Sequence, residues 1–257
     1  MSRTPVNYYR KFVIPKRNGQ YRLIYSPTVM LKIVQRWIAA GLQSNYAPPD
    51  HVFGFIPGRS HRDAASMHLS SNWVVSCDIE NFFPSVSRQQ VEQIFLELGY
   101  GINGANFASR LCCVNGVLAQ GSPASPVISN IVFRETDVKL LELSQKYSVK
   151  LSRYADDIVF SGDGKVPNEI ISDIKLMLKI QGWSVSSGKT HIAELPRRLK
   201  VHGLLVHGSQ VRLTKGYRHK LRAYRHIIDN ELSVSPEEEN RMRGHLSYAA
   251  FIDGQVT

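Results

Sequence analysis

One stretch, residues 150–162 (KLSRYADDIVFSG), constrains the fold more than any other part of the chain. Apolar residues on either side of residues 154–157 (YADD) predict two strands joined by a tight turn. Two adjacent carboxylates on a short turn repel each other and are poor strand formers, so stability alone does not explain them. A hard divalent cation such as Mg²⁺ prefers carboxylate oxygens and leaves room for substrate phosphates. The stretch therefore indicates either a cation site for phosphoryl transfer or an ordinary acidic turn in solvent.

The chain of 257 residues is long enough to bury a large core. Its longest apolar runs fall well short of the roughly 18 residues of a membrane helix. The start, MSRTPVNYYRK, lacks the apolar segment of a signal peptide, so we expect a cytoplasmic protein without a membrane partner. The cysteines, Cys77, Cys112 and Cys113, form no C-x-x-C pair, which predicts reduced thiols in the core.

Charge is distributed unevenly along the chain, whose net charge is +11. Residues 1–49 contain eight Lys or Arg and no Asp or Glu, and residues 189–226 contain ten Lys or Arg with Glu194 as the lone acid. Two basic ends around an acidic centre suggest a polyanion held over a metal site. The alternative is that the basic ends only improve solubility.

The hydrophobic pattern divides the chain into short strands and helices. The expected strands are a ribbon at 9–25 around Asn18-Gly19, a strand at 72–77, a strand at 183–187, and a hairpin of 201–206 with 210–213. The expected helices begin at Ser26-Pro27, near 63–68, at the Ser87 and Gln90 capping box, at 106–114, at 124–147, at Asn168, at 214–230 and at Ser235. Between them lie a glycine-punctuated loop at 51–60 (HVFGFIPGRS) and a polar turn at 118–123.

A third carboxylate, Asp78, comes directly after the predicted strand at 72–77. If the hairpin of residues 150–162 lies beside that strand in one antiparallel sheet, Asp78 and Asp156 can share two metal ions about 4 Å apart. One ion would activate a 3′-hydroxyl, and the other would hold a triphosphate and stabilise the leaving pyrophosphate. The sequence therefore predicts a two-metal site for in-line phosphoryl transfer.

Taken in order, these motifs resemble those of the reverse transcriptases of bacterial retrons. The resemblance is carried by the ribbon with Arg22, FGFIPGRS, DIENFFPSV around Asp78, AQGSPASPVISN, RYADD, SSGKT, KVHGLLV and RGHLSY, over about residues 9–252. It implies an α+β fold, the right-hand polymerase with fingers, an antiparallel RRM-like palm and a short, mainly helical thumb. We expect the fingers at 1–70, the palm at 71–200, and a primer-grip hairpin with an abbreviated thumb at 201–257.

The resemblance also implies roles for matching residues. Two Mg²⁺ ions would be held by Asp78, the backbone of Ile79, Asp156 and Asp157, with Lys189 as a possible general acid near the pyrophosphate. The nucleotide would contact Lys16, Arg22, Gln120, Gly121 and the expected steric gate Phe83. Primer and template would contact Arg59, Tyr154, Val201, His202, Gly203, Lys215, Arg218, Lys220, Arg222 and Arg225.

As implied by the family, the activity would be RNA-directed DNA synthesis on a structured noncoding RNA that serves as template and primer. The other partners would be dNTPs, the DNA–RNA product and an effector protein in an antiphage complex. Two residues depart from the retron pattern: Ala64 replaces an Asn, and His202 replaces a Thr. The alternatives are a bacterial defence reverse transcriptase of another group, including one that adds nucleotides without a template, and a catalytically idle RNA-binding scaffold.

Replacing the expected steric gate tests the nucleotide-pocket assignment. Phe83→Ala should admit ribonucleotides, because its ring would no longer clash with a ribose 2′-hydroxyl. Incorporation of ribonucleotides and deoxyribonucleotides by the two proteins measures this selectivity. Unchanged sugar discrimination in the variant would remove Phe83 as the gate.

Overall fold

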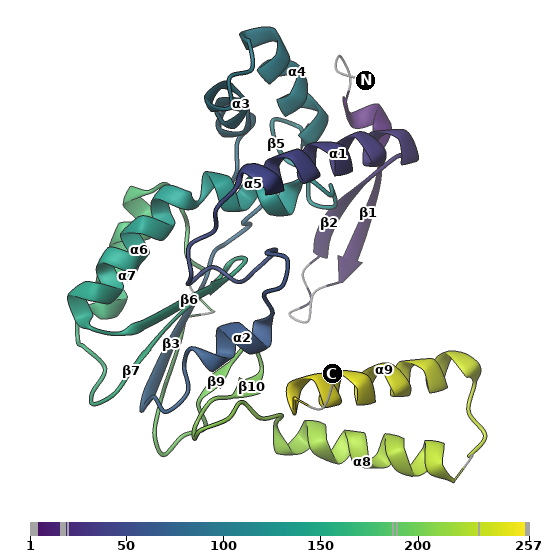
Figure 1. Ribbon diagram of the computed structural model, residues 1–257, viewed down its shortest axis with the longest axis vertical. Coiled ribbons are helices and arrows are strands. Elements are labelled where there is room, and N and C mark those ends of the chain that lie inside the picture. Colours follow the sequence, from purple (N-terminus) through teal and green to yellow (C-terminus); the bar gives the residue numbers. More distant parts are fainter. Residues whose placement is uncertain are drawn as a thin grey trace.

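The computed structural model describes residues 5–15, 19, 21–186, 188, 190–230 and 232–254. In this part of the chain the largest sheet is antiparallel, with the strand order β6-β7-β3-β8 (Figure 1). Its strands are β3 (Trp73–Asp78), β6 (Lys150–Tyr154), β7 (Asp157–Gly162) and β8 (His191–Glu194). The other strands form two-stranded ribbons: β1 (Tyr9–Pro15) with β2 (Tyr21–Pro27), β4 (Cys113–Val114) with β5 (Val117–Leu118), and β9 (Lys200–Val201) with β10 (Leu204–Leu205).

Helices surround this sheet and extend from both ends of it (Figure 1). They are α1 (Val29–Asn45), α2 (His61–Ser66), α3 (Arg88–Glu97), α4 (Ile102–Cys112), α5 (Ser125–Val132), α6 (Arg134–Tyr147), α7 (Ile170–Ile180), α8 (Lys215–Asp229) and α9 (Pro236–Ile252), and a 3₁₀ turn spans Pro5–Tyr8. The expected α+β fold with an antiparallel sheet and a helical C-terminal part is confirmed. None of the described helices is long and apolar enough to span a bilayer.

The two faces of the sheet meet different partners, because side chains alternate along a strand. On one face, Trp73, Val75 and Cys77 join the main core, to which α6 and α7 contribute. On the other face, Val74 and Val159 belong to a second core that includes residues of α2, of the β9–β10 hairpin and of α8 and α9. The register of β3 against β7 places Asp78 and Asp157 opposite each other on this second face.

Several sequence predictions of element boundaries are wrong. Ser26-Pro27 does not open a helix, because both residues pair with β1, and α1 begins after Thr28. The helix expected at 124–147 is two helices, α5 and α6, separated at Phe133. Helix α7 follows Glu169 rather than Asn168. Residues 210–213 do not form a strand; in the last hairpin β9 pairs with β10, and Arg212 forms an isolated bridge to Leu205.

The strand expected at 183–187 is also wrong, and side-chain packing explains the difference. Trp183 packs against Phe133 and Phe82, with ring centroids 4.8 and 5.7 Å away, and its Nε1 donates to Thr136 Oγ1 over 2.9 Å. In the described part of this segment the pairing is limited to one isolated bridge, from Val185 to Ile79, and the backbone hydrogen bonds on either side of it. The edge of the sheet next to β3 is formed instead by β8.

The cysteines lie in the core as predicted, and all three are free and buried. Burial raises the pKa of Cys77 to about 11 and that of Cys113 to about 12, and it also raises the pKa of Cys112. A buried thiol that stays protonated is a poor nucleophile. These side chains therefore act as small apolar groups.

A buried histidine joins α2 to the sheet on its second face. His68 follows α2, and its Nδ1 and Nε2 each lie 2.7 Å from a hydroxyl oxygen, of Ser161 and of Ser152 respectively. Ser71 extends the cluster through a contact of 2.9 Å with Ser161. A neutral imidazole satisfies both contacts, because one ring nitrogen donates and the other accepts.

Acid is expected to destabilise the fold through His68. Burial lowers the pKa of His68 to about 3, so the folded protein stays unprotonated where the unfolded chain, with a pKa near 6.5, takes up a proton. This contribution to the free energy of unfolding is therefore complete above about pH 6.5 and is lost as the pH falls towards about 3, by about 1.4 kcal/mol per pH unit. Urea unfolding at several pH values in this window measures the slope.

His68→Gln should reduce the slope, because glutamine keeps a donor and an acceptor but does not titrate. His219→Gln, a matched control on the exposed side of α8, should leave it unchanged. An equal slope in wild type and His68→Gln would contradict the prediction.

Candidate active site

The expected meeting of the three aspartates occurs at one end of the large sheet. Cα pairing sets Tyr154 of β6 opposite Asp157 of β7, and Asp157 opposite Asp78 of β3. The side chains of Tyr154, Asp157 and Asp78 thus form one row across three strands, here called the carboxylate row. Asp156 lies in the turn between β6 and β7, and its carbonyl accepts from the Ile79 amide over 2.9 Å. The prediction that Asp78 and the YADD turn lie together is confirmed.

The segment after Trp183 lies beside the end of β3. The Ser186 amide donates to the Asp78 carbonyl over 2.9 Å, and its hydroxyl lies 3.4 Å from Asp78 Oδ1. Asp78, Asp156 and Asp157 are all partly exposed, so their carboxylates remain accessible at the surface of the fold. No group of three or more His, Cys, Asp and Glu side chains within the described ranges is arranged to hold a metal ion. The three carboxylates therefore do not form a ready-made set of three ligands.

A histidine from the last hairpin contacts the carboxylate row. His202 lies in the turn between β9 and β10, and its Nδ1 is 3.1 Å from Asp157 Oδ2. Its ring also packs on Tyr154, with centroids 5.3 Å apart. The sequence predicts that Val201, His202 and Gly203 lie at the primer end, and the structure brings this hairpin to Asp157 and Tyr154.

The YADD turn has a strained backbone. Ala155 has a φ of 58°, a left-handed conformation that is costly for a residue with a Cβ and that hairpin turns usually give to glycine. Arg153 supports it, since its Nη1 donates to the Ala155 carbonyl over 3.0 Å. Strained backbone persists only where the surroundings hold it in place, and it is concentrated at functional sites.

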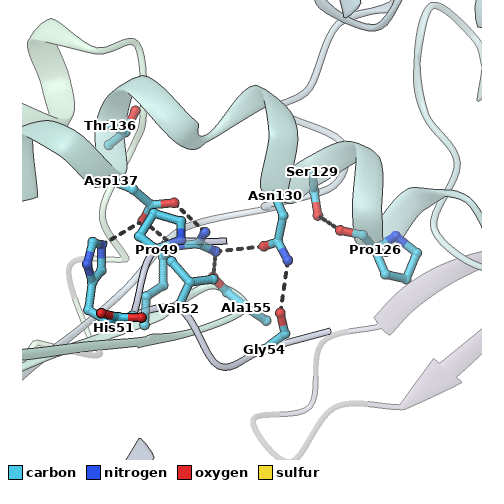
Figure 2. Close-up of polar contacts among 12 residues, drawn as sticks. Pro49, His51, Val52, Gly54, Pro126, Ser129, Asn130, Thr136, Asp137 and Ala155 are labelled. Carbon is cyan, nitrogen blue, oxygen red and sulfur yellow. Dashed lines mark hydrogen bonds and ion pairs between the residues drawn. The ribbon is translucent and has the colours of Figure 1, made fainter. Parts of the chain in front are cut away.

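Arg153 is itself held by a buried network (Figure 2). Its side chain is fully buried, and its Nε and Nη2 donate to the two carboxylate oxygens of Asp137 over 2.7 and 2.6 Å. Its Nη1 also donates to Asn130 Oδ1 over 3.0 Å, and the guanidinium lies 4.6 Å from the centroid of the Phe133 ring. His51 Nε2 lies 3.6 Å from Asp137, too far for a hydrogen bond.

The loop before α2 packs directly on the YADD turn. The Phe53 amide donates to the Arg153 carbonyl over 2.8 Å, and Asn130 Nδ2 donates to the Gly54 carbonyl over 2.9 Å (Figure 2). A Cβ on Gly54 would lie 2.1 Å from the Ala155 nitrogen, which leaves room for glycine alone. Gly54 is thus required for the contact of this loop with the YADD turn.

The polar turn at residues 118–123 packs against the N-terminal ribbon. The Tyr25 amide donates to the Gln120 carbonyl over 2.8 Å. Gly121 has a φ of 125°, and a Cβ there would lie 2.6 Å from the Tyr25 carbonyl oxygen. Gln120 is partly exposed, as is Phe83, whose ring packs on Phe55 with centroids 5.9 Å apart.

Comparisons with known proteins agree with this geometry. The family model described as reverse transcriptase (RNA-dependent DNA polymerase) matches residues 14–230. The chain belongs to the reverse transcriptase family. It is 31% identical over 243 residues to the Retron Mx65 reverse transcriptase of Myxococcus xanthus, an alignment that covers 87% of this chain and 57% of that protein. It is 26% identical over 252 residues to the Retron Ec86 reverse transcriptase of Escherichia coli, with coverage of 96% and 77%.

These relatives identify the chain as a reverse transcriptase of retron type. Among solved structures, it is similar to telomerase from Candida albicans in complex with a fragment of telomeric RNA, with a TM-score of 0.55 and 10% identity. That alignment covers 88% of this chain and 51% of the telomerase chain. At this identity the likeness shows a common fold alone.

For other predicted site residues of the reverse transcriptase, the nucleotide and nucleic-acid contacts stay predictions. Lys16 and Lys189 lie outside the described residues. Arg22 is exposed on β2. Lys215, Arg218, Lys220, Arg222 and Arg225 are exposed on α8, which projects with α9 away from the sheet (Figure 1). Among them, Arg218 forms an ion pair of 3.5 Å with Asp253.

Arg59 supports its own loop through its guanidinium. Its Nη1 donates to the carbonyls of Pro49 and Val52 over 2.6 and 2.7 Å. Its Nη2 lies 3.7 Å from Asp50 Oδ1, and the guanidinium packs 5.9 Å from the centroid of the Phe53 ring. These contacts hold the loop that packs on the YADD turn, and the contact of Arg59 with nucleic acid stays a prediction.

Sequence reasoning missed the Arg153, Asp137 and Asn130 network in this reverse transcriptase. A signal for it exists in the alternation of β6, which puts Arg153 on the same face as buried Leu151. Asp137 lies one turn before buried Leu140 on α6, so an acid stands on the apolar face of that helix. A charge on a buried face of each of two neighbouring elements predicts that they pair.

Removing the acid of this buried ion pair should destabilise the protein strongly. Asp137→Asn leaves the Arg153 guanidinium buried without its counterion, for which a loss of about 3–5 kcal/mol in unfolding free energy is typical. Glu142→Gln, on the same helix, removes an exposed partner of Lys139 and should cost about 1 kcal/mol or less. Denaturant unfolding of the two variants measures both values, and equal losses would refute the importance of the buried pair.

Proposed function

We propose that this protein is an RNA-directed DNA polymerase of retron type, which adds deoxynucleotides to a primer hydroxyl on a structured noncoding RNA template. The chain spans 57% of the length of the Mx65 enzyme. The proposal rests on one observation above all: Asp78 and Asp157 are paired on adjacent strands next to Asp156, in a chain of the reverse transcriptase family.

The carboxylate end of the sheet has the donor chemistry that a divalent cation requires. Mg²⁺ is usually held by one or two carboxylates, with waters and substrate phosphates completing its coordination, so a cage of three protein side chains is not needed. Asp78, Asp156 and Asp157 supply partly exposed carboxylate oxygens, and the Ile79 backbone lies beside them. Reverse transcriptases generally use divalent metal ions. We propose two Mg²⁺ ions here, which when bound would activate the primer hydroxyl and stabilise the leaving pyrophosphate.

The chain's own residues then bind and orient the substrates. The Gly121 backbone and the Gln120 amide border the nucleotide pocket, and the contact of this turn with Tyr25 fixes it against the N-terminal ribbon. The Phe83 ring, supported by Phe55, limits the space at the sugar. On the ribbon, Arg22 and Lys16 would bind the triphosphate. Lys189 would protonate the leaving pyrophosphate.

The regions are proposed to divide into fingers at 1–70, a palm at 71–200, and a primer-grip hairpin with a thumb at 201–257. The β9–β10 hairpin contacts Tyr154 and Asp157 of the carboxylate row, which favours a primer end at this position. The basic residues of α8 listed above are exposed and suit a phosphate backbone, because each contact neutralises one phosphate. Salt-dependent contacts between these side chains and phosphates would hold the RNA and the DNA–RNA product over the palm.

The biological setting follows by analogy with the relatives rather than from the site. A noncoding RNA partner is supported by the identity to retron reverse transcriptases. We propose that the product and an effector protein form an antiphage complex with this chain. Testing that role requires the chain's native RNA and its genetic neighbours.

The polymerase proposal predicts that activity depends on the carboxylates at the end of the sheet. With Mg²⁺, dNTPs and co-purified RNA, wild type should synthesise templated DNA. Asp78→Asn and Asp156→Asn should each reduce the rate by at least about 100-fold, because each removes a carboxylate that would hold the Mg²⁺ ions. Asp163→Asn, an exposed aspartate at the opposite end of β7, should retain the wild-type rate.

The outcomes also separate the competing functions. RNA binding without synthesis by wild type would favour a catalytically idle scaffold. Product that forms without regard to the template sequence would favour an untemplated enzyme. Sequencing the product against the RNA distinguishes templated from untemplated addition.

A further inference from the structure

The turn that carries His202 has a conformation for which asparagine and glycine are preferred over histidine. His202 and Gly203 form the two-residue connection between β9 and β10, with φ values of 49° and 82°. Two successive left-handed residues are the pattern of a type I′ hairpin turn, for which Asn-Gly is the favoured sequence. The β4–β5 hairpin of the same chain follows that preference, with Asn115 and Gly116 at φ values of 53° and 81°.

The His202 side chain carries a second unfavourable feature. It is 8% exposed, and its Nε2 is buried without a hydrogen-bond partner. A buried donor or acceptor that is left unsatisfied is costly, and each such group calls for an explanation. Strained backbone and an unsatisfied polar atom in one residue are expected where function rather than stability selects the side chain.

The contacts of His202 indicate what that function is. The strands on either side are anchored in the second core, where Val201 and Leu204 are almost completely buried. From this fixed hairpin, Nδ1 reaches Asp157 Oδ2 at 3.1 Å, and the ring packs on Tyr154. His202 therefore touches two of the three members of the carboxylate row from a separate, rigid element.

We infer that His202 is a positioning residue, which orients the Asp157 carboxylate and fixes the hairpin at a set distance from the carboxylate row. The inference deepens the proposed polymerase function, in which the hairpin takes the primer end. If the primer end lies at the hairpin, the His202 side chain sets the distance between the primer hydroxyl and the aspartates. One carboxylate oxygen of Asp157 is engaged by His202, so Asp157 acts in part by linking the hairpin to the palm.

His202→Gly tests the contribution of the His202 side chain without disturbing the backbone conformation of the turn. Glycine adopts a positive φ without steric cost, so the variant keeps a favourable turn while it loses the contact with Asp157. Asn115→Gly is the matched control, because it makes the same change in an equivalent turn that lies in another ribbon. Thermal unfolding of both variants verifies that they are folded.

The first measurement, amide hydrogen exchange, does not depend on polymerase activity. Amide hydrogen exchange should increase at least about tenfold at residues 153–158 and 200–206 in His202→Gly, because the two segments lose their link. In Asn115→Gly, exchange at both segments should stay at the wild-type rate. Unchanged exchange at residues 153–158 in folded His202→Gly would overturn the inference.

The second measurement is primer extension with Mg²⁺. His202→Gly should lower kcat by at least about tenfold, because a small misplacement of reacting groups is enough for such a loss. The KM for dNTP should change by less than about twofold, since the nucleotide pocket lies elsewhere. In an Asp157→Asn background, His202→Gly should add little further loss, because the two residues act as a pair.

The two measurements distinguish failure of the inference from failure of the proposed function. Wild-type kcat in His202→Gly, or full additivity with Asp157→Asn, would overturn the positioning role. If wild type makes no DNA, the polymerase proposal fails, and the exchange experiment alone then supports or overturns the link between the hairpin and the turn.

Discussion

The buried ion pair between Arg153 and Asp137 is the interaction on which the candidate active site depends. Two charges taken out of water are stabilising only when their geometry is good and further hydrogen bonds satisfy them. Here the pair is bidentate, and Arg153 also binds Asn130 and the Ala155 carbonyl. Through these bonds, α5 and α6 hold the left-handed turn that presents Asp156. The loop with Gly54 packs on the same turn, so one guanidinium organises three segments that are distant in sequence.

The two faces of the large sheet have different roles. One face joins the main core, which fixes the strands and their register, and it also carries the buried Arg153. The other carries the carboxylate row and the His68 cluster, and it is covered by α2 and the C-terminal segments. His61 of α2 extends this second layer, since its ring lies 6.3 Å from Tyr154 and stacks at 5.6 Å on Tyr248 of α9. The aspartates are thus supported by a rigid core on one side and by the hairpin and α9 on the other.

The strongly patterned elements could be predicted from the sequence. The alternating β1–β2 ribbon, the Ser87 capping box and the YADD hairpin are where local signals placed them, because each depends on neighbouring residues. Less local features were missed. The strand expected from Trp183 onwards is absent, and the indole ring of Trp183 packs instead against Phe82 and Phe133, which are distant in sequence. The hydrogen bonds from Arg59 to carbonyls of its own loop were also missed, because they form only when the loop folds back on itself.

The sequence by itself determined the family, the antiparallel hairpin with its two aspartates, and the acid that ends the strand at Asp78. These follow from residue order and from the two-residue period of strands, both of which are local properties. Only the tertiary structure decided that Arg153 is buried against Asp137 and that His202 contacts Asp157. Such contacts join residues whose separation in sequence carries no information about distance. They form when elements pack together: Arg153 is then removed from water and needs the Asp137 carboxylate as its counterion, and the last hairpin is brought to the end of the sheet that carries Asp157.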